Sequence, residues 1–525
     1  MKKPLKEKRS PGTVLCAVYL ALLFLLLPLV VHQAYYDITL TKAVVFWTLS
    51  ALLSAGCAVW LLTSREARAQ LTLPAAAELL FAVFALTQIV STLFFRPIGP
   101  GITAPDNRYQ GIASFALYLL SFMLLRRYAR FDSTAQYALL LGCSAAALLA
   151  VFEVFGLDLL GMRAISPTLQ RPRFFSTVGN ISFLSALCVL MLPVCLCLAV
   201  SADSSAPAAA FGGCGLVFLC CGIAMRAETF VLGVLACYAL LAVFIRSARA
   251  LRRLPLLCAL SALAVLLFTL AMKRWGLYRL SDLTALLSRP VILLALAVLF
   301  LGLWLLGRRA DDASWLRARR VYCFLLAGLI LALAIFLVLA NTVWRSRLSE
   351  QLASVVVFSP SWGSDRGKEW LSFWKMFREA PLLKKLIGSG AGSLAEWDFS
   401  HRLFPDAITD SAHNEYLHYL LTGGILGLSA YLGVLALALC SSFQRPGPVR
   451  TALALGAACY SVQAMVNIAQ PFTTPLFFTV LALLCSESAP DTEPGGSERP
   501  IFSIVGLTVL AAALLVWASA MVSRC

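Results

Sequence analysis

Charged residues and histidines are scarce in this sequence. Only 13% of its 525 residues are charged and four are histidines, whereas 60% are hydrophobic. Soluble domains carry about 25% charged residues. The shortage of charge therefore excludes an ordinary soluble protein and predicts a chain that lies mostly within a membrane.

Motifs for disulfide pairing and metal binding are also absent. The 16 cysteines lie almost all inside apolar stretches, where they act as small hydrophobes. The sequence has no CxxC pair, no cysteine–histidine cluster with metal spacing and no Asp-x-Asp pair in the segments expected to face outward. We therefore predict no disulfide framework, no metal and no other cofactor.

The apolar residues fall in runs that are long enough to cross a bilayer, since about 20 helical residues span a hydrocarbon core of about 30 Å. We predict an all-α, polytopic membrane fold of about 14–15 transmembrane helices. The predicted spans are residues 12–31, 43–63, 73–95, 112–125, 134–156, 181–200, 207–225, 229–245, 254–272, 289–307, 321–341, 416–441, 450–467, 471–486 and 500–521.

The net charge of +17 raises the question of nucleic-acid binding, which we do not expect. The basic residues cluster in short loops between spans, as the positive-inside rule requires. The N-terminal side holds 22 basic residues, and the opposite side holds 12 once the long polar loop is left out. The N-terminus is therefore predicted to be cytoplasmic, and the long loop is predicted to face outward.

Four segments follow from this topology. Residues 1–341 form an N-terminal bundle of about 11 spans, and residues 342–415 form a large external loop. Residues 416–486 return to the membrane, and residues 487–525 are an acidic linker followed by a last span.

His413 is the leading candidate for chemistry. The stretch His413-Asn414-Glu415-Tyr416 lies where the long polar loop re-enters the apolar chain. An imidazole at this boundary can exchange a proton near neutral pH with both lipid-borne and water-borne substrates. His418 lies about 140° around the same helix, so it is expected to face elsewhere and to be structural.

Several arginines break the charge rule by facing outward. They are Arg108, Arg163, Arg171, Arg173, Arg226 and Arg366. Each alone could snorkel or contact lipid phosphates. Several on one face, opposite the same histidine, favour an anion site.

The long loop contains an amphipathic pattern. Between Asp365 and Phe377, aromatic residues recur at helical spacing with basic residues between them. This pattern predicts a helix that ends before Pro381 and lies on the membrane surface. The glycine-rich run 388–392 follows, and its backbone amides could approach a ligand, although an ordinary loop is an equal alternative.

These motifs, in this order, resemble those of the O-antigen ligase/polymerase family of bacterial membrane glycosyltransferases. Residues 108–112 (RYQGI) resemble its aromatic-glycine entry into a span, and residues 173–180 (RFFSTVGN) resemble its Arg…Gly-Asn element. Residues 225–227 (MRA) resemble its Ser-Arg turn, with methionine in place of serine. The external-loop segment 366–390, the His-Asn element and the glycines at 423–427 complete a resemblance that covers about residues 100–485.

The resemblance implies a multi-helical glycosyltransferase of the GT-C-like type. Its donor would be a glycan on a polyprenyl (undecaprenyl) diphosphate, and its acceptor a saccharide, lipid-linked glycan or protein at the outer face of the bacterial cytoplasmic membrane.

The expected chemistry follows from the donor. Departure of a diphosphate needs fixed positive charge, which we assign to Arg173, Arg226, Arg366 and Arg171. His413 would activate the acceptor, with Asn414 or Glu415 orienting it or the sugar. Arg108, Tyr416 and Gly390 are candidates for acceptor or glycan contacts. Direct displacement without a metal would invert the anomeric centre.

Two alternatives remain open at this point. A polysaccharide polymerase or a protein O-oligosaccharyltransferase would share the donor chemistry. A transporter or flippase of lipid-linked glycans would belong to a different class, and it should show an internal repeat, which the sequence lacks.

Overall fold

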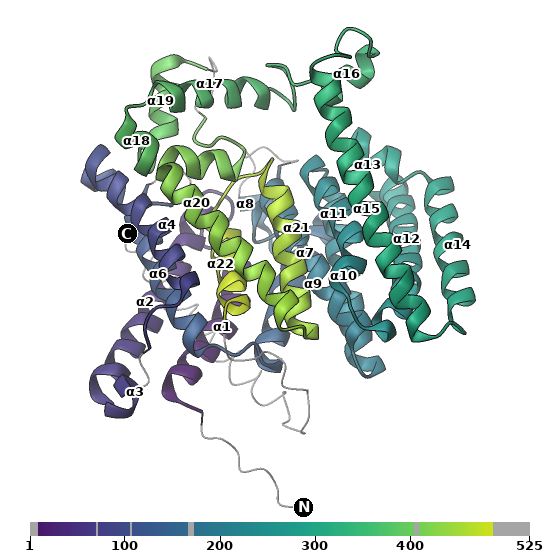
Figure 1. Cartoon of the computed structure of the whole chain (residues 1–525), viewed down its shortest axis with the longest axis horizontal. Helices are drawn as coiled ribbons and strands as arrows, with labels where there is room; N and C mark the ends of the chain where they lie inside the picture. The colour runs from purple at the N-terminus through teal and green to yellow at the C-terminus, as the bar shows by residue number, and fades with distance from the viewer. Residues whose placement is uncertain (1–8, 70–71, 105–107, 166–172, 404–408, 487–525) are drawn as a thin grey trace, which may run out of the picture.

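The computed structural model describes residues 9–69, 72–104, 108–165, 173–403 and 409–486. Long helices stand side by side, and short helices cover one end of them (Figure 1). The all-α prediction is confirmed. The strands in the described ranges form a single two-stranded antiparallel hairpin, β1 (Phe174–Phe175) and β2 (Gly179–Asn180).

Ten helices in the described ranges are long and apolar enough to cross a membrane. They are α1 (Pro11–Leu29), α2 (Ile38–Thr63), α4 (Ala76–Phe95), α7 (Ser133–Val154), α9 (Ile181–Ser201), α10 (Ser205–Ala224), α12 (Ala248–Trp275), α14 (Pro290–Gly307), α15 (Asp312–Asn341) and α20 (Glu415–Gln444). Each coincides with a predicted span. The protein is a multi-pass membrane protein.

Four further predicted spans correspond to shorter helices: α6 (Ile112–Tyr128), α11 (Glu228–Phe244), α21 (Pro448–Ala464) and α22 (Thr473–Leu484). The 12 residues of α22 rise about 18 Å, so the helical part of span 471–486 is too short to cross a core of about 30 Å alone. The last predicted span, 500–521, lies outside the described residues.

Several helices extend beyond the predicted spans. The helix α12 begins at Ala248 rather than at residue 254, and α15 begins at Asp312 rather than at residue 321. Hydropathy detects only the apolar part of a helix, whereas in these two helices the backbone is already helical in the basic turns that precede it at the interface. The basic turns of α12 and α15 carry arginines such as Arg252 and Arg319.

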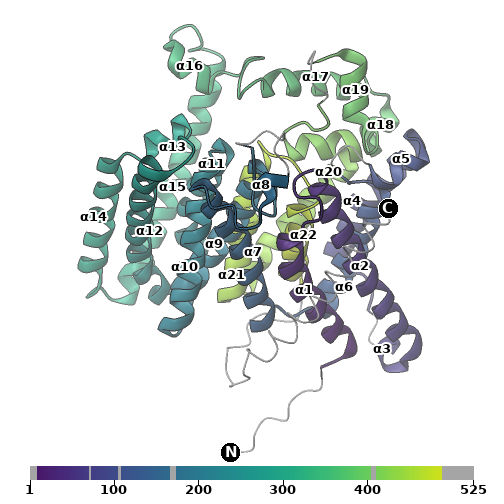
Figure 2. The same ribbon diagram turned by 180° about the vertical axis from the view of Figure 1, so that it is seen from behind.

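The bundle has a dense centre and a loosely attached edge. The whole span of α9 is buried, and α7, α10 and α21 pack around it. In contrast, Leu293 and Ala297 are the buried residues of α14, and Ala340 is the buried residue of α15. Both helices lie at one side of the bundle against α12 (Figure 2).

Short helices complete the two ends. Those of the external loop lie together over one end of the bundle (Figure 1): α16 (Glu350–Val356), α17 (Arg366–Glu379), α18 (Leu382–Ile387) and α19 (Ser393–His401). The others are α3 (Arg65–Ala69), α5 (Ile98–Thr103), α8 (Met162–Ile165) and α13 (Asp282–Leu287). The helix predicted around residues 365–377 is therefore present as α17, and it ends before Pro381 as expected.

The loop is attached to the bundle at a break in α20. Gly424 has non-helical dihedrals there, φ 70° and ψ −173°. The break leaves two carbonyl groups that accept backbone bonds from the loop: Ser389 N–H donates to Leu421 O at 2.8 Å, and Gly390 N–H donates to Thr422 O at 3.1 Å. Ser91 of α4 also donates to Thr422 O, at 2.8 Å. The glycine run is therefore a docking element between α4 and α20.

We predict that Gly388→Ala destabilises the protein. Gly388 has φ +91°, and an added Cβ would lie 2.0 Å from the backbone oxygen of Thr422, which cannot move aside. The expected loss is about 1–3 kcal/mol or more, measured as thermal unfolding of the detergent-solubilised protein. Gly302→Ala in α14 is the matched control, because a Cβ there meets nothing within 4 Å. Equal melting of both variants would contradict the docking role.

Candidate functional site

Three of the helices that begin at the loop-covered end of the bundle concern the predicted site. The helices α9, α11 and α20 start after Asn180, Ala227 and Asn414. Gln463 of α21 ties two of these starts together, because its Nε2 donates to Ser185 of α9 at 2.8 Å and to Thr229 of α11 at 3.3 Å. Helix N-termini carry partial positive charge, so this end of the bundle favours anions.

His413 stands directly before α20 and pairs with an acid from the loop. Its Nδ1 lies 3.0 Å from Oε2 of Glu369 in α17. The His413 side chain is 35% exposed, whereas that of Glu369 is 10% exposed. An ionised carboxylate only accepts hydrogen bonds, so this contact favours the neutral tautomer with its proton on Nδ1, in which Nε2 has a lone pair that can accept a proton.

Glu369 was not among the residues predicted from the sequence. Glu369, Phe373 and Met376 form the buried face of α17, at spacings of four and three residues. An acid on the apolar face of an amphipathic helix is the signal that could have identified it. The helix is held in place by Trp370, whose Nε1 donates to Ala412 O at 2.8 Å, and by Phe373, which packs with Leu421 of α20.

Arg366 lies one turn before Glu369 on the same helix. Burial lowers the pKa of its guanidinium, while the carboxylates of Glu369 and Glu228 act in the opposite direction. Glu228 is the first residue of α11 and follows Arg226 by two positions. The external loop therefore brings a half-buried cation close to the start of α11.

Arg226 occupies the turn between α10 and α11, with φ +57°. Its guanidinium lies 5.0 Å from the ring centre of Tyr278, and burial lowers its pKa. Arg163 approaches the same ring and donates to the Tyr278 hydroxyl at 3.0 Å. Because Arg163 also pairs with Glu153 at 3.5 Å, its charge is already balanced within the protein.

The predicted Arg173 lies at the start of the β1–β2 hairpin with an exposed side chain. The hairpin reaches the Arg226 region through Phe175, whose ring contacts Tyr278 with centres 5.5 Å apart. The hairpin therefore links Arg173 to the same end of the bundle as Arg226. Arg171 lies outside the described residues.

Asn414 and Glu415 have structural partners. The side-chain oxygen of Asn414 caps α20 by accepting from Leu417 N–H at 3.0 Å. Glu415 is 1% exposed, and its two carboxylate oxygens accept from the hydroxyls of Tyr431 at 3.2 Å and Tyr460 at 3.1 Å. The carboxylate of Glu415 thus points into the bundle, while the ring of His413 meets the loop.

The three candidates for glycan contacts are also engaged within the protein. Arg108 donates to Asp410 at 2.6 Å, and the Tyr416 hydroxyl donates to Ser461 O at 2.7 Å. The amide of Gly390 bonds to Thr422, and a Cβ there would lie 2.8 Å from Thr92 Cα. Close packing requires a glycine at this position, and its contact with a glycan stays a prediction. His32 pairs with Asp37, and His401 stacks on Trp397.

Within the described ranges, no group of three or more His, Cys, Asp or Glu side chains is arranged to hold a metal. The cations near His413 and Tyr278 are instead arginines. The prediction of metal-independent chemistry stays a prediction.

Comparison with known families identifies the segment that holds His413. Residues 280–432 match the family described as O-Antigen ligase, which confirms the resemblance predicted from the sequence. The match contains Arg366, Glu369 and His413, whereas Arg108, Arg173 and Arg226 precede it. A search of curated proteins found no match. The chain is thus a multi-pass membrane protein with a segment that is similar to O-antigen ligases.

We predict that Glu415→Ala and His413→Ala separate structure from chemistry. Removing the Glu415 carboxylate leaves two buried tyrosine hydroxyls without an acceptor, and each unpaired hydroxyl lowers the free energy of unfolding by on the order of 1–3 kcal/mol. His413→Ala removes a part-exposed ring and leaves one carboxylate, that of Glu369, without this partner, so thermal unfolding should change less than in Glu415→Ala. Melting of the two purified variants measures the difference, and a loss of stability in His413→Ala equal to that in Glu415→Ala would contradict this division.

Proposed function

We propose that the protein transfers a glycan from a polyprenyl diphosphate to an acceptor at the outer face of the bacterial cytoplasmic membrane. The observation that carries this proposal is the Glu369–His413 pair. It lies in the segment similar to O-antigen ligases, at the end of a membrane bundle, with the half-buried Arg366 one turn away. A base, a charge partner and a cation are the groups that such a transfer requires.

The donor diphosphate is proposed to lie at the starts of α9 and α11. Its departure adds negative charge, which Arg226, Arg366 and Arg173 would stabilise. Arginine stays charged and binds phosphate oxygens in pairs. Arg226 and Arg366 are half-buried, so fewer water molecules compete with them and each charge acts more strongly on the leaving group than it would in open solvent.

His413 is proposed to act as the base toward the acceptor. The acceptor hydroxyl gives its proton to Nε2 while its oxygen attacks the anomeric carbon. The bond from that carbon to the diphosphate oxygen breaks, and its electron pair leaves with the diphosphate. Glu369 stabilises the imidazolium that forms. A single displacement of this kind inverts the anomeric centre and needs no metal.

A polymerase is the second candidate within this class, since its acceptor would be another lipid-linked glycan and the donor chemistry is the same. A defined donor distinguishes the two reactions by product size. A ladder of products indicates a polymerase, and one en-bloc addition indicates a ligase. Addition to a protein would identify an O-oligosaccharyltransferase.

We predict that His413→Ala lowers transfer about 10²–10⁴-fold and that Arg226→Ala lowers it about 10²–10³-fold. Membranes carrying each variant are supplied with a polyprenyl-linked oligosaccharide, with and without EDTA. His401→Ala and Arg249→Ala are the controls, because both side chains are exposed and neither contacts His413, Glu369 or Arg226. Wild-type rates in both site variants, at equal expression, would reject the proposal. Loss of turnover in EDTA would reject the metal-independent step.

We predict that Glu369→Gln lowers kcat about 10²-fold or more while KM for the donor changes little, because the amide cannot stabilise an imidazolium. Glu369→Asp should recover part of kcat, since it restores the charge. A purely structural role would instead lower the stability of both variants and leave kcat per folded molecule unchanged. Kinetics normalised to folded protein distinguish the two.

A further inference from the structure

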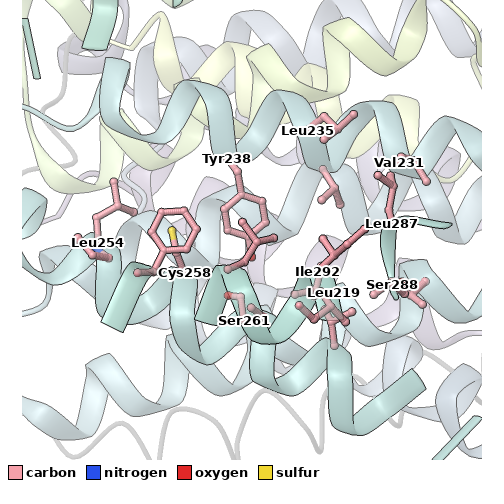
Figure 3. Close-up of a pocket in the computed structure, with 18 of the residues that line it drawn as sticks. Leu219, Val231, Leu235, Tyr238, Leu254, Cys258, Ser261, Leu287, Ser288 and Ile292 are labelled. Atoms are coloured by element: carbon pink, nitrogen blue, oxygen red, sulfur yellow. The ribbon is translucent and has the colours of Figure 1, made fainter. Parts of the chain in front are cut away.

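An apolar groove runs through the membrane part of the protein, apart from the polar site. It encloses about 530 Å³ between α10, α11, α12, α13, α14 and α15. Figure 3 shows side chains such as Leu235, Tyr238, Leu254 and Ser261 along it. Its size lies within the range of about 300–1,000 Å³ that is common for ligand pockets.

The groove is long and follows the helices. Phe230 and Ala242 both line it, and they are twelve residues apart on α11, which corresponds to about 18 Å. A hydrocarbon core is about 30 Å thick. The groove therefore runs along the membrane normal for about the length of a hydrocarbon chain that extends through one leaflet.

The outer end of the groove meets the candidate anion site. Ile223 and Phe230, which line the groove, flank the Arg226 turn on either side. The short helix α13 borders the same region through Thr284 and Ser288, and it follows Tyr278, the ring beneath the Arg226 guanidinium. A molecule with an anionic head at Arg226 would thus place an attached apolar chain in the groove.

One wall of the groove packs against little of the rest of the protein. It includes α14 and α15, of which few residues are buried. An empty apolar space of this size would forfeit dispersion contacts along its lining. A bound chain would supply them.

We propose that this groove binds the isoprenoid tail of a polyprenyl diphosphate whose head lies at Arg226. The inference rests on the proposed function and adds the place of the donor lipid. Bilayer phospholipid is the competing occupant, but its chains have no reason to favour this groove over the rest of the lipid-facing surface. The diphosphate–arginine attraction gives the polyprenyl donor that reason.

Photo-crosslinking tests the location without requiring turnover. The full-length protein in membranes is irradiated with a polyprenyl diphosphate that carries a photoreactive group in its isoprenoid chain, and adducts are mapped by mass spectrometry. Adducts on groove residues of α11, α12 or α15 that unlabelled polyprenyl diphosphate displaces, and phospholipid does not, support the proposal. Adducts displaced equally by phospholipid, or adducts elsewhere on the chain, overturn it. A complete lack of adducts overturns both this proposal and the donor class.

A matched pair of substitutions tests the consequence for rate. Ala262 lines the groove, whereas the adjacent Leu263 is 39% exposed on the outside of α12. Phenylalanine at position 262 would fill part of the groove, which only the long-chain donor needs. We therefore expect Ala262→Phe to lower kcat/KM for a long-chain donor, relative to kcat/KM for a short-chain donor, about tenfold. Leu263→Phe should leave that ratio unchanged. If wild-type protein transfers from both donors and Ala262→Phe keeps the wild-type ratio, the groove proposal fails while the proposed function stands.

Discussion

The break in α20 at Gly424 is the constraint on which the rest of the site depends. Inside a membrane, backbone groups released by a break must find partners within the protein, because lipid offers none. Here the partners are amides of the external loop, at Ser389 and Gly390, together with the hydroxyl of Ser91. The need to satisfy these carbonyl groups fixes an otherwise solvent-facing loop to a defined place on the bundle.

This attachment brings together groups that are distant in the sequence. His413 and Glu369 are separated by 44 positions, yet their side chains lie 3.0 Å apart. Before the docking point, α17 lies against α20. After it, the chain continues through α19 and returns to His413 at the start of α20. Because both ends of the pair are anchored to the same helix, their distance depends on the geometry of α20 rather than on the flexibility of a long loop.

The sequence predicted the parts of this structure that depend on local pattern. Hydropathy located the spans of the described residues, and helical spacing located α17. The membrane boundary pointed to His413 as a candidate, and its role stays a prediction. The sequence did not predict which residue faces His413, since the partner of an imidazole is decided by tertiary contact. For the same reason the glycine run 388–392 was open to interpretation as a ligand loop. Its docking on Thr422 depends on a break that is visible only once α20 is built.

The partners of the buried acids show why Glu369 differs from the others. Glu78 pairs with Arg127 at 2.6 Å, Glu153 accepts from Ser176 N–H at 3.1 Å, and Glu415 accepts from two tyrosine hydroxyls. In these three cases the donor keeps its proton at neutral pH, so the contact is fixed and supports the fold. Glu369 alone among these four faces a group that can gain or lose a proton, and that group is partly exposed. A carboxylate whose donors keep their protons holds neighbouring elements in place, whereas one that faces an imidazole can also stabilise the charge that a proton transfer creates.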